Sequence, residues 1–425
     1  MNEEENKSLE TVVPSESESE KKKGMSSFFA SIKTKFVKKD NAPSDELPRD
    51  KREPLIRIAK RNNVTWKTKL IAGLSCVGTA ILVSILFLWA ISGANPFSII
   101  GAIFQGTFGN SIKLWAAIKE IVILLAVALA LLPAYKMRFW NVGGQGQILI
   151  GALLTAICMQ YLGDKMPSAL VIIFSIIFAA VGGALWAYIP AIFKAKWNTN
   201  ETLFTLMLNY IAVLLVTFFT DRWKGQKSSM GTINSSTKSG WLPTLKLGSA
   251  IDGKVLIPLI LVILLTVFMY FYLRKTKHGY EIEVVGDSVS TARYTGIPVP
   301  HVIRRTLAMS GCICGLVGFF YVAGFDHTLS ATTSGGYGFS AVIICWLSNF
   351  NPFVMIGYSS LLIFLEQGGR NLSNTMYYQY SGLNEYSTQL AVFLIIIAIM
   401  LTSFFIRYRL VFAKDNKVTV KKAEQ

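Results

Sequence analysis

The chain contains eight runs of apolar residues, each close to the length needed to cross a lipid bilayer. A spanning helix needs about 20 apolar residues, because each residue advances about 1.5 Å through a hydrocarbon layer about 30 Å thick. Backbone polar groups inside that layer must be satisfied within the protein, so the runs predict helices. They cover residues 69–92, 114–134, 146–163, 168–190, 203–221, 255–273, 306–323 and 389–407.

Two shorter apolar runs, 338–349 and 352–366, lie between the last two long ones and are separated by Asn351 and Pro352. We expect them to form two short or partly re-entrant helices, which makes about ten membrane segments in all. The predicted fold class is therefore an all-α polytopic membrane protein. Its membrane domain should cover residues 66–410.

The charge distribution predicts how the chain is oriented. Residues 1–68 carry 12 of the 25 acidic and 15 of the 42 basic residues, which leaves 13 acids and 27 bases for the rest. Lysine and arginine mark the cytoplasmic loops of membrane proteins. On this rule both termini lie in the cytoplasm, with a cytoplasmic loop at 275–305 and an external loop at 222–254, although the external loop is itself basic. The predicted cytoplasmic clusters include Lys136, Arg138, Lys194, Lys196, Arg274, Lys275, Lys277, Arg304 and Arg305.

The two ends of the chain are charged and poor in aromatic residues. Residues 1–65 alternate acidic and basic clusters and are expected to be a disordered cytoplasmic tail, and residues 411–425 to be a basic cytoplasmic tail. Residues 26–39 mix phenylalanines with lysines, so either a helix on anionic lipid or a plain tail fits them. The net charge of +17 does not indicate nucleic-acid binding, because no soluble domain carries a basic stripe.

The chemistry-bearing motifs of enzymes and metalloproteins are missing from the sequence. All five cysteines fall in apolar runs and are expected to be small buried side chains, and the three histidines are scattered. Phosphate-binding GxxxxGK[ST], GxSxG and HExxH motifs do not occur. We therefore expect no catalytic residues, no metal, no cofactor and no ATP hydrolysis by this chain.

Three stretches place polar side chains inside membrane-length runs, where they are costly and default to functional candidates. The first follows a basic turn and supplies Asn141, Gln145 and Gln147 between glycines; either a broken helix at a substrate path or a packed turn explains it. In the second, Glu201, Thr205 and Asn209 share one helix face, toward a path or a neighbouring helix. The candidate path residues are Asn141, Gln145, Gln147, Glu201, Thr205, Asn209 and, in the third stretch, Asn349.

The third stretch, residues 339–370, also contains Glu366 and Arg370, which are four residues apart on a helix. A plain ion pair near the outer surface is the favoured interpretation of these two residues.

Residues 279–297, GYEIEVVGDSVSTARYTGI, are polar and lie between two apolar runs. Asp287 is placed to cap a short helix, Arg293 falls in its last turn, and Gly296 can end it in the left-handed conformation. Val289 and Ala292 lie one turn apart on this helix. A capped helix here has little of its own chain to pack against, so the segment is expected to dock another protein.

Four stretches together resemble the permease subunits of ABC importers of the branched-chain amino-acid and simple-sugar type, and most of all the nucleoside branch. That branch has the patterns FNIGxEGQ, ExxxTLMLNY, GYxLRAVGxNxxAAxYxGI and GxxGIAVALLGxxNP. This chain has FWNVGGQGQ, ETLFTLMLNY, the 279–297 sequence and GYGFSAVIICWLSNFNP in the same order. This chain differs from the branch at three places. Gln145 stands where the branch has Glu, and Glu283 stands where it has Arg. Asp287 and Ser288 stand where the branch has any residue followed by Asn, before the docking turn.

The resemblance implies a multi-pass permease of the cell membrane that works with several partners. These are a cytosolic ABC ATPase, a second permease subunit that completes a heterodimer, and an extracellular binding lipoprotein of the basic-membrane-protein type that delivers a nucleoside. The residues carried over to the ATPase contact are Gly286, Asp287, Ala292, Arg293, Tyr294 and Gly296. A permease of the same family for a simple sugar or an amino acid is the alternative. A stand-alone secondary transporter would need more ionisable groups within its spans.

Overall fold

The computed structural model describes residues 56–60, 66–227, 229–245, 253–376, 380 and 382–412. The chain divides into two compact units, residues 60–408 and, separately, residues 1–59 with 409–425. Strands β1 (Ile56–Lys60) and β2 (Tyr408–Phe412) pair in a two-stranded sheet. The segment at 26–39 and most of the two predicted tails lie outside the described residues.

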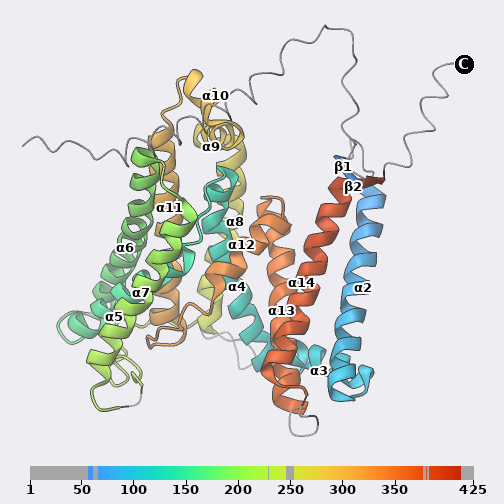
Figure 1. Ribbon diagram of the computed structural model, residues 1–425. Helices are drawn as coiled ribbons and strands as arrows, with labels where there is room; N and C mark the ends of the chain where they lie inside the picture. Colours follow the sequence, from blue (N-terminus) through green and yellow to red (C-terminus); the bar gives the residue numbers. More distant parts are fainter. Residues whose placement is uncertain are drawn as a thin grey trace, which may run out of the picture. The chain divides into compact units, whose positions relative to one another are not determined.

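The larger unit is built from helices (Figure 1). In chain order they are α2 (Trp66–Ser92), α3 (Pro96–Phe108), α4 (Ser111–Lys136), α5 (Gly144–Leu162), α6 (Ser168–Trp197), α7 (Glu201–Lys224), α8 (Gly253–Lys275), α9 (Lys277–Asp287), α10 (Val289–Tyr294), α11 (Val299–Phe319) with the π-turn η1 (Phe320–Phe325), α12 (Tyr337–Leu347), α13 (Pro352–Met376) and α14 (Glu385–Arg407).

All eight long apolar runs fall on helices, as predicted. Within the described residues, seven helices are long and apolar enough to cross a bilayer, and the bent pair α2 and α3, which meet at 113°, would make eight. The expected total of about ten is not confirmed. Helix α12 has only 11 residues, and α13 carries Glu366, Gln367, Arg370 and Asn371 in its second half.

The prediction of two short helices between α11 and α14 was half right. Helix α12 is short, but α13 does not stop at residue 366 and continues for 25 residues to Met376. The two helices are joined by a tight turn in which Asn349 and Phe350 have φ angles of 52° and 59°. Because an α-helix rises about 1.5 Å per residue, α12 covers about half the thickness of a bilayer and α13 all of it.

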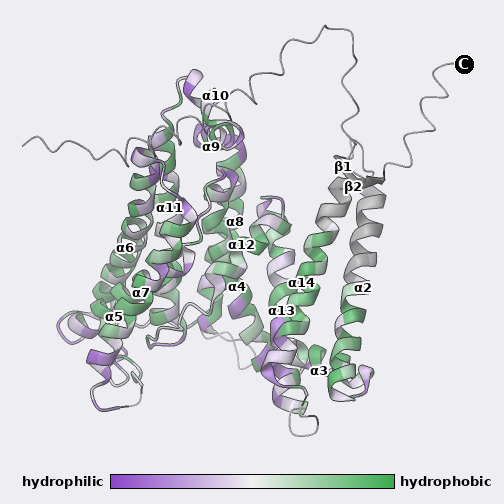
Figure 2. Cartoon of the chain, in the orientation of Figure 1, coloured by the Kyte–Doolittle hydropathy of each residue, from purple (hydrophilic) through white to green (hydrophobic). Residues whose placement is uncertain are grey.

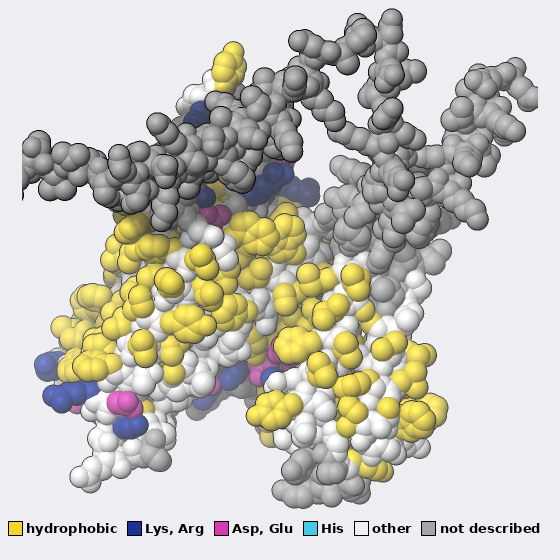
Figure 3. All heavy atoms as spheres, viewed as in Figure 1, with side chains coloured by type: hydrophobic (Ala, Val, Ile, Leu, Met, Phe, Trp, Pro, Cys, Tyr) yellow, Lys and Arg dark blue, Asp and Glu magenta, His cyan; other side chains and the backbone are white. Residues whose placement is uncertain are grey.

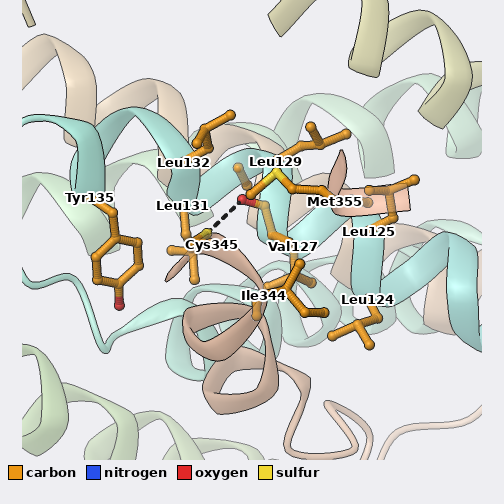
Figure 4. Close-up of a cluster of buried hydrophobic side chains, with 14 of the residues drawn as sticks. Leu124, Leu125, Val127, Leu129, Leu131, Leu132, Tyr135, Ile344, Cys345 and Met355 are labelled. Atoms are coloured by element: carbon orange, nitrogen blue, oxygen red, sulfur yellow. Dashed lines mark hydrogen bonds between the residues drawn. The ribbon is translucent and has the colours of Figure 1, made fainter. Parts of the chain in front are cut away.

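Helix α4 is the centre of the larger unit. Its residues from Val122 to Tyr135 are buried all round, and a helix that is apolar on every side is stable only when other helices surround it. Ile344 and Cys345 of α12 and Met355 of α13 pack on this helix (Figure 4). The Cys345 thiol donates a hydrogen bond to the carbonyl oxygen of Ala128 at 3.3 Å. Cys158, Cys314 and Cys345 are buried, as expected, whereas Cys312 is half-buried.

Helices α6 and α11 approach each other through glycines. A Cβ atom added at Gly311 would lie 2.2 Å from the carbonyl oxygen of Gly183, and one added at Gly315 would lie 2.1 Å from that of Ala179. Small residues permit this contact, which is a common way of packing helices in a membrane.

Large apolar side chains cover the flanks of the helices (Figure 3). Leu185 on α6, Leu214 on α7 and Leu264 on α8 are each at least 60% exposed. A soluble monomer rarely exposes a contiguous apolar surface of this kind, whereas a bilayer covers it at no cost. Hydropathy agrees with this, because the apolar colour lies along the middle of the helices and the polar colour gathers at their ends (Figure 2).

The connections lie at two ends of the larger unit (Figure 1). Here "the α10 end" means residues 137–143, 198–200 and 276–298, and "the α3 end" means residues 93–110, 163–167, 225–227, 229–245, 376, 380 and 382–384. Lys136, Arg138, Lys194 and Arg305 all reach acidic side chains at the α10 end. These basic residues were predicted to share one side of the membrane.

The predicted external loop is ordered where the structure describes it. Ile233 and Leu242 donate backbone hydrogen bonds to His327 and Ala323, both at 2.8 Å, and the Trp241 indole stacks on the His327 ring at 3.7 Å between centroids. Burial, together with the positive charge of Lys254, lowers the pKa of His327 to about 4, so this imidazole is neutral at physiological pH. The described part of the loop is therefore packed against residues 323–327 at the α3 end.

Two cysteine substitutions test the orientation. Ser236 in this loop and Ser290 in α10 are both exposed, so each accepts a thiol without loss of packing. We expect an impermeant maleimide to label Ser236→Cys in intact cells, and Ser290→Cys only after permeabilisation, both in a chain without its native cysteines. The reverse pattern would show that the α10 end faces outward.

Candidate functional site

The polar segment between α8 and α11 folds into two short helices, α9 and α10. The Thr276 hydroxyl caps α9 by accepting a hydrogen bond from the Gly279 amide at 3.1 Å. Ser288 has an extended backbone (φ −157°) and its hydroxyl accepts from the Thr291 amide at 3.2 Å, so it caps α10. The prediction that Asp287 is the cap was wrong, because Asp287 is the last residue of α9 and already has a helical backbone.

Helix α10 presents one side to solvent and buries the other. Tyr294 is 94% exposed, Val289 is 44% exposed and Arg293 is exposed, whereas Ala292 is completely buried. Gly296 ends the helix with φ +78°, in the left-handed region predicted for it. A Cβ added there would meet no described atom within 4 Å, so the backbone angle is what requires glycine.

Helix α9 is fastened to the membrane helices, contrary to the expectation that this segment has little of its own chain to pack against. Ile282 and Val285 are buried in the main core. The Arg305 guanidinium of α11 binds the nearly buried Glu281 carboxylate at 2.9 Å. The Lys136 ammonium of α4 binds Glu283 at 3.0 Å.

Glu283 attaches α9 to α4 through its ion pair with Lys136, although the resembled branch has Arg at position 283. Exposed pairs contribute about 0–1 kcal/mol, so the apolar packing of α9 stabilises the attachment more than Glu283 does. Gly286 allows the close approach, because a Cβ at this position would lie 2.3 Å from the carbonyl oxygen of Lys136. Two of the six predicted docking residues, Gly286 and Ala292, are therefore buried in the fold.

The non-helical segment between α4 and α5 is held by side-chain amides. The Tyr135 hydroxyl donates to the carbonyl oxygen of Asn141 at 2.7 Å. Asn141 is completely buried, and its Oδ1 accepts from the Gly143 amide at 3.1 Å and from Gln147 Nε2 at 3.2 Å. These bonds satisfy backbone groups that a bilayer cannot.

Helix α7 supplies a further side-chain amide that holds this segment. We call the hydrogen bonds of Asn141, Gln147 and Asn209 around the segment the amide brace. Asn209 Oδ1 accepts from the Gly146 amide at 2.8 Å, and its Nδ2 donates to the carbonyl oxygen of Val142 at 3.0 Å. The Thr205 hydroxyl is 1% exposed and donates to the carbonyl oxygens of Glu201 and Thr202. The Glu201 carboxylate accepts from Lys194 at 2.8 Å.

The structure brings together most of the residues predicted for a path, in a packed arrangement. Asn141, Gln147, Thr205 and Asn209 are buried together around the broken segment. Gln145 is half-buried, and its side-chain oxygen has no hydrogen-bond partner among the described residues. Asn349 lies apart from this group, exposed in the turn between α12 and α13.

Two pockets bring together residues that the sequence did not group with one another. The first, of about 370 Å³, lies between α12, α13 and α14. Its lining includes Phe339, Ser340, Glu366, Arg370, Glu385, Gln389 and Phe393. The second, of about 460 Å³, lies at the α10 end and is lined by Tyr135, Lys136, Arg138, Trp140, Glu283, Asp287, Trp346 and Phe350.

Arg370 binds a second carboxylate, that of Glu120, in addition to the Glu366 carboxylate that was expected as its partner. Its guanidinium donates a short hydrogen bond to Glu120 of α4 and lies 4.0 Å from the Glu366 carboxylate. Three charged groups from two helices therefore meet beside the first pocket. Positions 120 and 370 are 250 residues apart, so only the fold brings them together.

The sequence of this chain matches a known family. The family described as "Branched-chain amino acid transport system / permease component" matches residues 118–402, from the buried helix α4 to α14. The chain belongs to this permease family. Members are subunits of ABC transporters, which depend in general on ATPase and binding-protein partners, and the apolar helices agree with a multi-pass protein of the plasma membrane.

The permease has relatives whose names state different substrates. It is 26% identical to a guanosine ABC transporter permease protein of Bacillus subtilis over 286 residues, which cover 66% of this chain and 80% of that protein. It is 25% identical to a nucleoside ABC transporter permease protein of Lactococcus lactis over 292 residues, 66% of this chain and 79% of that protein. A glucose ABC transporter permease protein of Haloferax volcanii is 27% identical over 334 residues, 76% of this chain and 85% of that protein.

The amide brace makes a testable contribution to stability. Replacing Asn209 by Ala leaves the Gly146 amide and the Val142 carbonyl buried without a partner, which costs about 1–3 kcal/mol for each group. We expect a clearly lower unfolding temperature for the detergent-solubilised permease. The adjacent Tyr210 is 65% exposed, so Tyr210→Ala is the control and should leave that temperature nearly unchanged. Equal effects of the two substitutions would contradict the brace.

Proposed function

We propose that this permease is the membrane subunit of an ATP-driven importer of nucleosides. In this proposal the α10 end faces the cytoplasm with both termini, and a separate ABC ATPase docks on α10. An extracellular binding lipoprotein delivers the nucleoside to the α3 end. A second, different permease subunit completes the complex.

ATPase docking on α10 is inferred from an exposed aromatic side chain on a helix whose buried face and ends are fixed. Tyr294 is almost fully exposed on a helix whose cap, buried alanine and left-handed glycine fix its direction. An exposed aromatic side chain on a rigid support is a good anchor for a protein partner. Arg293 and Asp287, both exposed, add charge around it.

The attachment of α9 provides a route for movement. Glu281 links α9 to α11, and Glu283 links it to the end of α4. Helix α4 in turn packs on α12 through Cys345 and Ile344. Packed helices move as rigid bodies, so a displacement of α10 by an ATPase is passed to the helices that line both pockets.

The choice of nucleosides is supported by two of the relatives and by the chemistry of the pockets. Those two relatives are named as permeases for guanosine and for nucleosides. Aromatic rings with hydrogen-bonding side chains beside them suit a flat base joined to a hydroxyl-rich sugar. The relative named for glucose supports a simple sugar as the second candidate, and an amino acid is the remaining alternative.

Uptake by the whole complex tests the substrate. In proteoliposomes that contain the permease, its partner subunits and the lipoprotein, we expect ATP-dependent accumulation of labelled guanosine that unlabelled nucleosides inhibit. Labelled glucose and leucine serve as comparisons and should not accumulate. Accumulation of glucose without guanosine would favour the second candidate, and guanosine uptake by this chain alone on an ion gradient would refute the importer.

A pair of substitutions at Gly296 tests the docking helix. A β-branched residue in the left-handed conformation costs about 1–2 kcal/mol, so Gly296→Val should depopulate the native end of α10 by roughly 5- to 30-fold and reduce uptake accordingly. Asparagine adopts this conformation more readily, so Gly296→Asn should retain most of the activity. Uptake and ATP hydrolysis are measured together, because loss of coupling lowers uptake per ATP consumed. Normal coupling in the valine variant would count against docking at α10.

A further inference from the structure

One face of α12 carries an exposed aromatic residue near each end and a half-buried isoleucine between them. Phe339, Ile343 and Trp346 follow one another at four- and three-residue steps, which places them on the same side of the helix. Phe339 is 43% exposed and Trp346 is 42% exposed, although both lie on a helix within the apolar part of the chain. The opposite side, with Ala341, Ile344 and Cys345, is completely buried against the core. We call the exposed side the α12 face.

The α12 face begins at the first pocket. Helix α12 starts after Gly335 and Gly336, which both have left-handed backbones, and its first turns share a pocket with Glu366 and Gly369 of α13. Glu366 lies about 21 Å along α13 from its first residue, at a rise of about 1.5 Å per residue. The first pocket therefore lies beside the middle of α13 and the first turn of α14.

This pocket is too polar to face lipid. The Glu366 and Arg370 side chains are 28% and 42% exposed, and Gln389 donates from Nε2 to the Glu385 carboxylate at 3.1 Å. Charged groups on membrane helices face water, a substrate or another protein chain, because facing hydrocarbon costs several kcal/mol. Phe339 and Phe393 form the apolar part of the same lining.

The second pocket lies at the other end of the α12 face. Trp346 stacks on Trp140 with 5.3 Å between ring centroids and 21° between planes, and Phe350 meets Trp346 edge-on at 5.6 Å. Lys136 and Glu283 line the same pocket. One helix face thus connects the first pocket, beside the middle of α13, with an aromatic pocket at the α10 end.

We propose that the α12 face is the surface along which a nucleoside crosses this permease. In the first pocket the base stacks on Phe339 or Phe393, and the ribose hydroxyls bond to Glu385, Gln389 and Glu366. In the second pocket the base stacks against Trp346. The nucleoside assignment rests on the function proposed above, whereas the location rests on the geometry of α12.

Charge around the first pocket refines the ligand class. Glu366 and Glu385 line it, and Arg370 is already paired with Glu120, so the acidic groups exceed the basic ones. Such a lining repels phosphate and accepts hydrogen bonds from hydroxyl and amino groups. The ligand is thus an uncharged nucleoside and not a nucleotide. The second permease subunit supplies the wall opposite the exposed rings.

Chemical modification tests the location directly. Ser340 lines the first pocket beside the α12 face, and Leu264, in the middle of α8, is 60% exposed on a lipid-facing flank. Each is changed to cysteine in a chain whose native cysteines are replaced, within the full complex in proteoliposomes. A charged methanethiosulfonate needs a hydrated thiolate, so we expect it to modify Ser340→Cys and leave Leu264→Cys unmodified. Guanosine should slow the reaction at position 340 severalfold.

Transport by ring variants tests the role of stacking. Base stacking on an aromatic side chain is lost in Phe339→Ala, so guanosine uptake at saturating lipoprotein should fall roughly 5- to 100-fold. Phe339→Tyr keeps the aromatic ring, so this variant should retain uptake close to that of the wild type. Leu264→Ala, which removes an exposed apolar side chain away from both pockets, is the control and should transport normally.

The outcomes separate this inference from the proposed function. If the wild-type complex imports guanosine but position 340 is unreactive or unprotected and Phe339→Ala transports normally, the path is wrong and the function stands. If the complex imports glucose, and glucose instead of guanosine protects position 340, the nucleoside assignment is wrong here and in the proposed function.

Discussion

The need to satisfy backbone groups away from water governs the break between α4 and α5. Seven residues there leave the helical conformation, beside a helix that is buried all round. Asn141 and Asn209 replace the missing helical bonds with side-chain amides, without bringing a charge into the membrane. The glycines at 143 and 146 let these amides reach the backbone. The rest of the α10 end is built around this turn, because α9 docks on the end of α4 immediately before it.

The positions of the long helices could be predicted from the sequence because their length and apolarity are imposed by the bilayer. Gly296 could also be predicted, since few other residues adopt its backbone angle without strain. Asp287 and Ser288 are both good caps and adjacent, so the sequence could not decide between them. Only the point at which α9 ends assigns the cap to Ser288.

The direction in which the polar residues point could not be predicted. Thr205 and Asn209 share a helix face, and such a face fits either a path or a neighbouring helix. The structure turns both inward. The first pocket was missed for a different reason. Its residues come from three helices and are dispersed over more than fifty positions, from Gly335 to Phe393, so no local pattern marks it.

The two proposals depend on the same mechanical unit. Glu283 and Asp287 of α9 line the second pocket together with Trp140 and Trp346, so the element that supports the docking helix also forms a wall at the end of the α12 face. The Trp140–Trp346 stack closes that end between α12 and the braced segment. A movement of α9 relative to α12 changes the width of this pocket before it changes the first, which is farther from α9. Under the proposed function, ATPase docking therefore acts on the exit step of transport, while the first pocket selects the substrate.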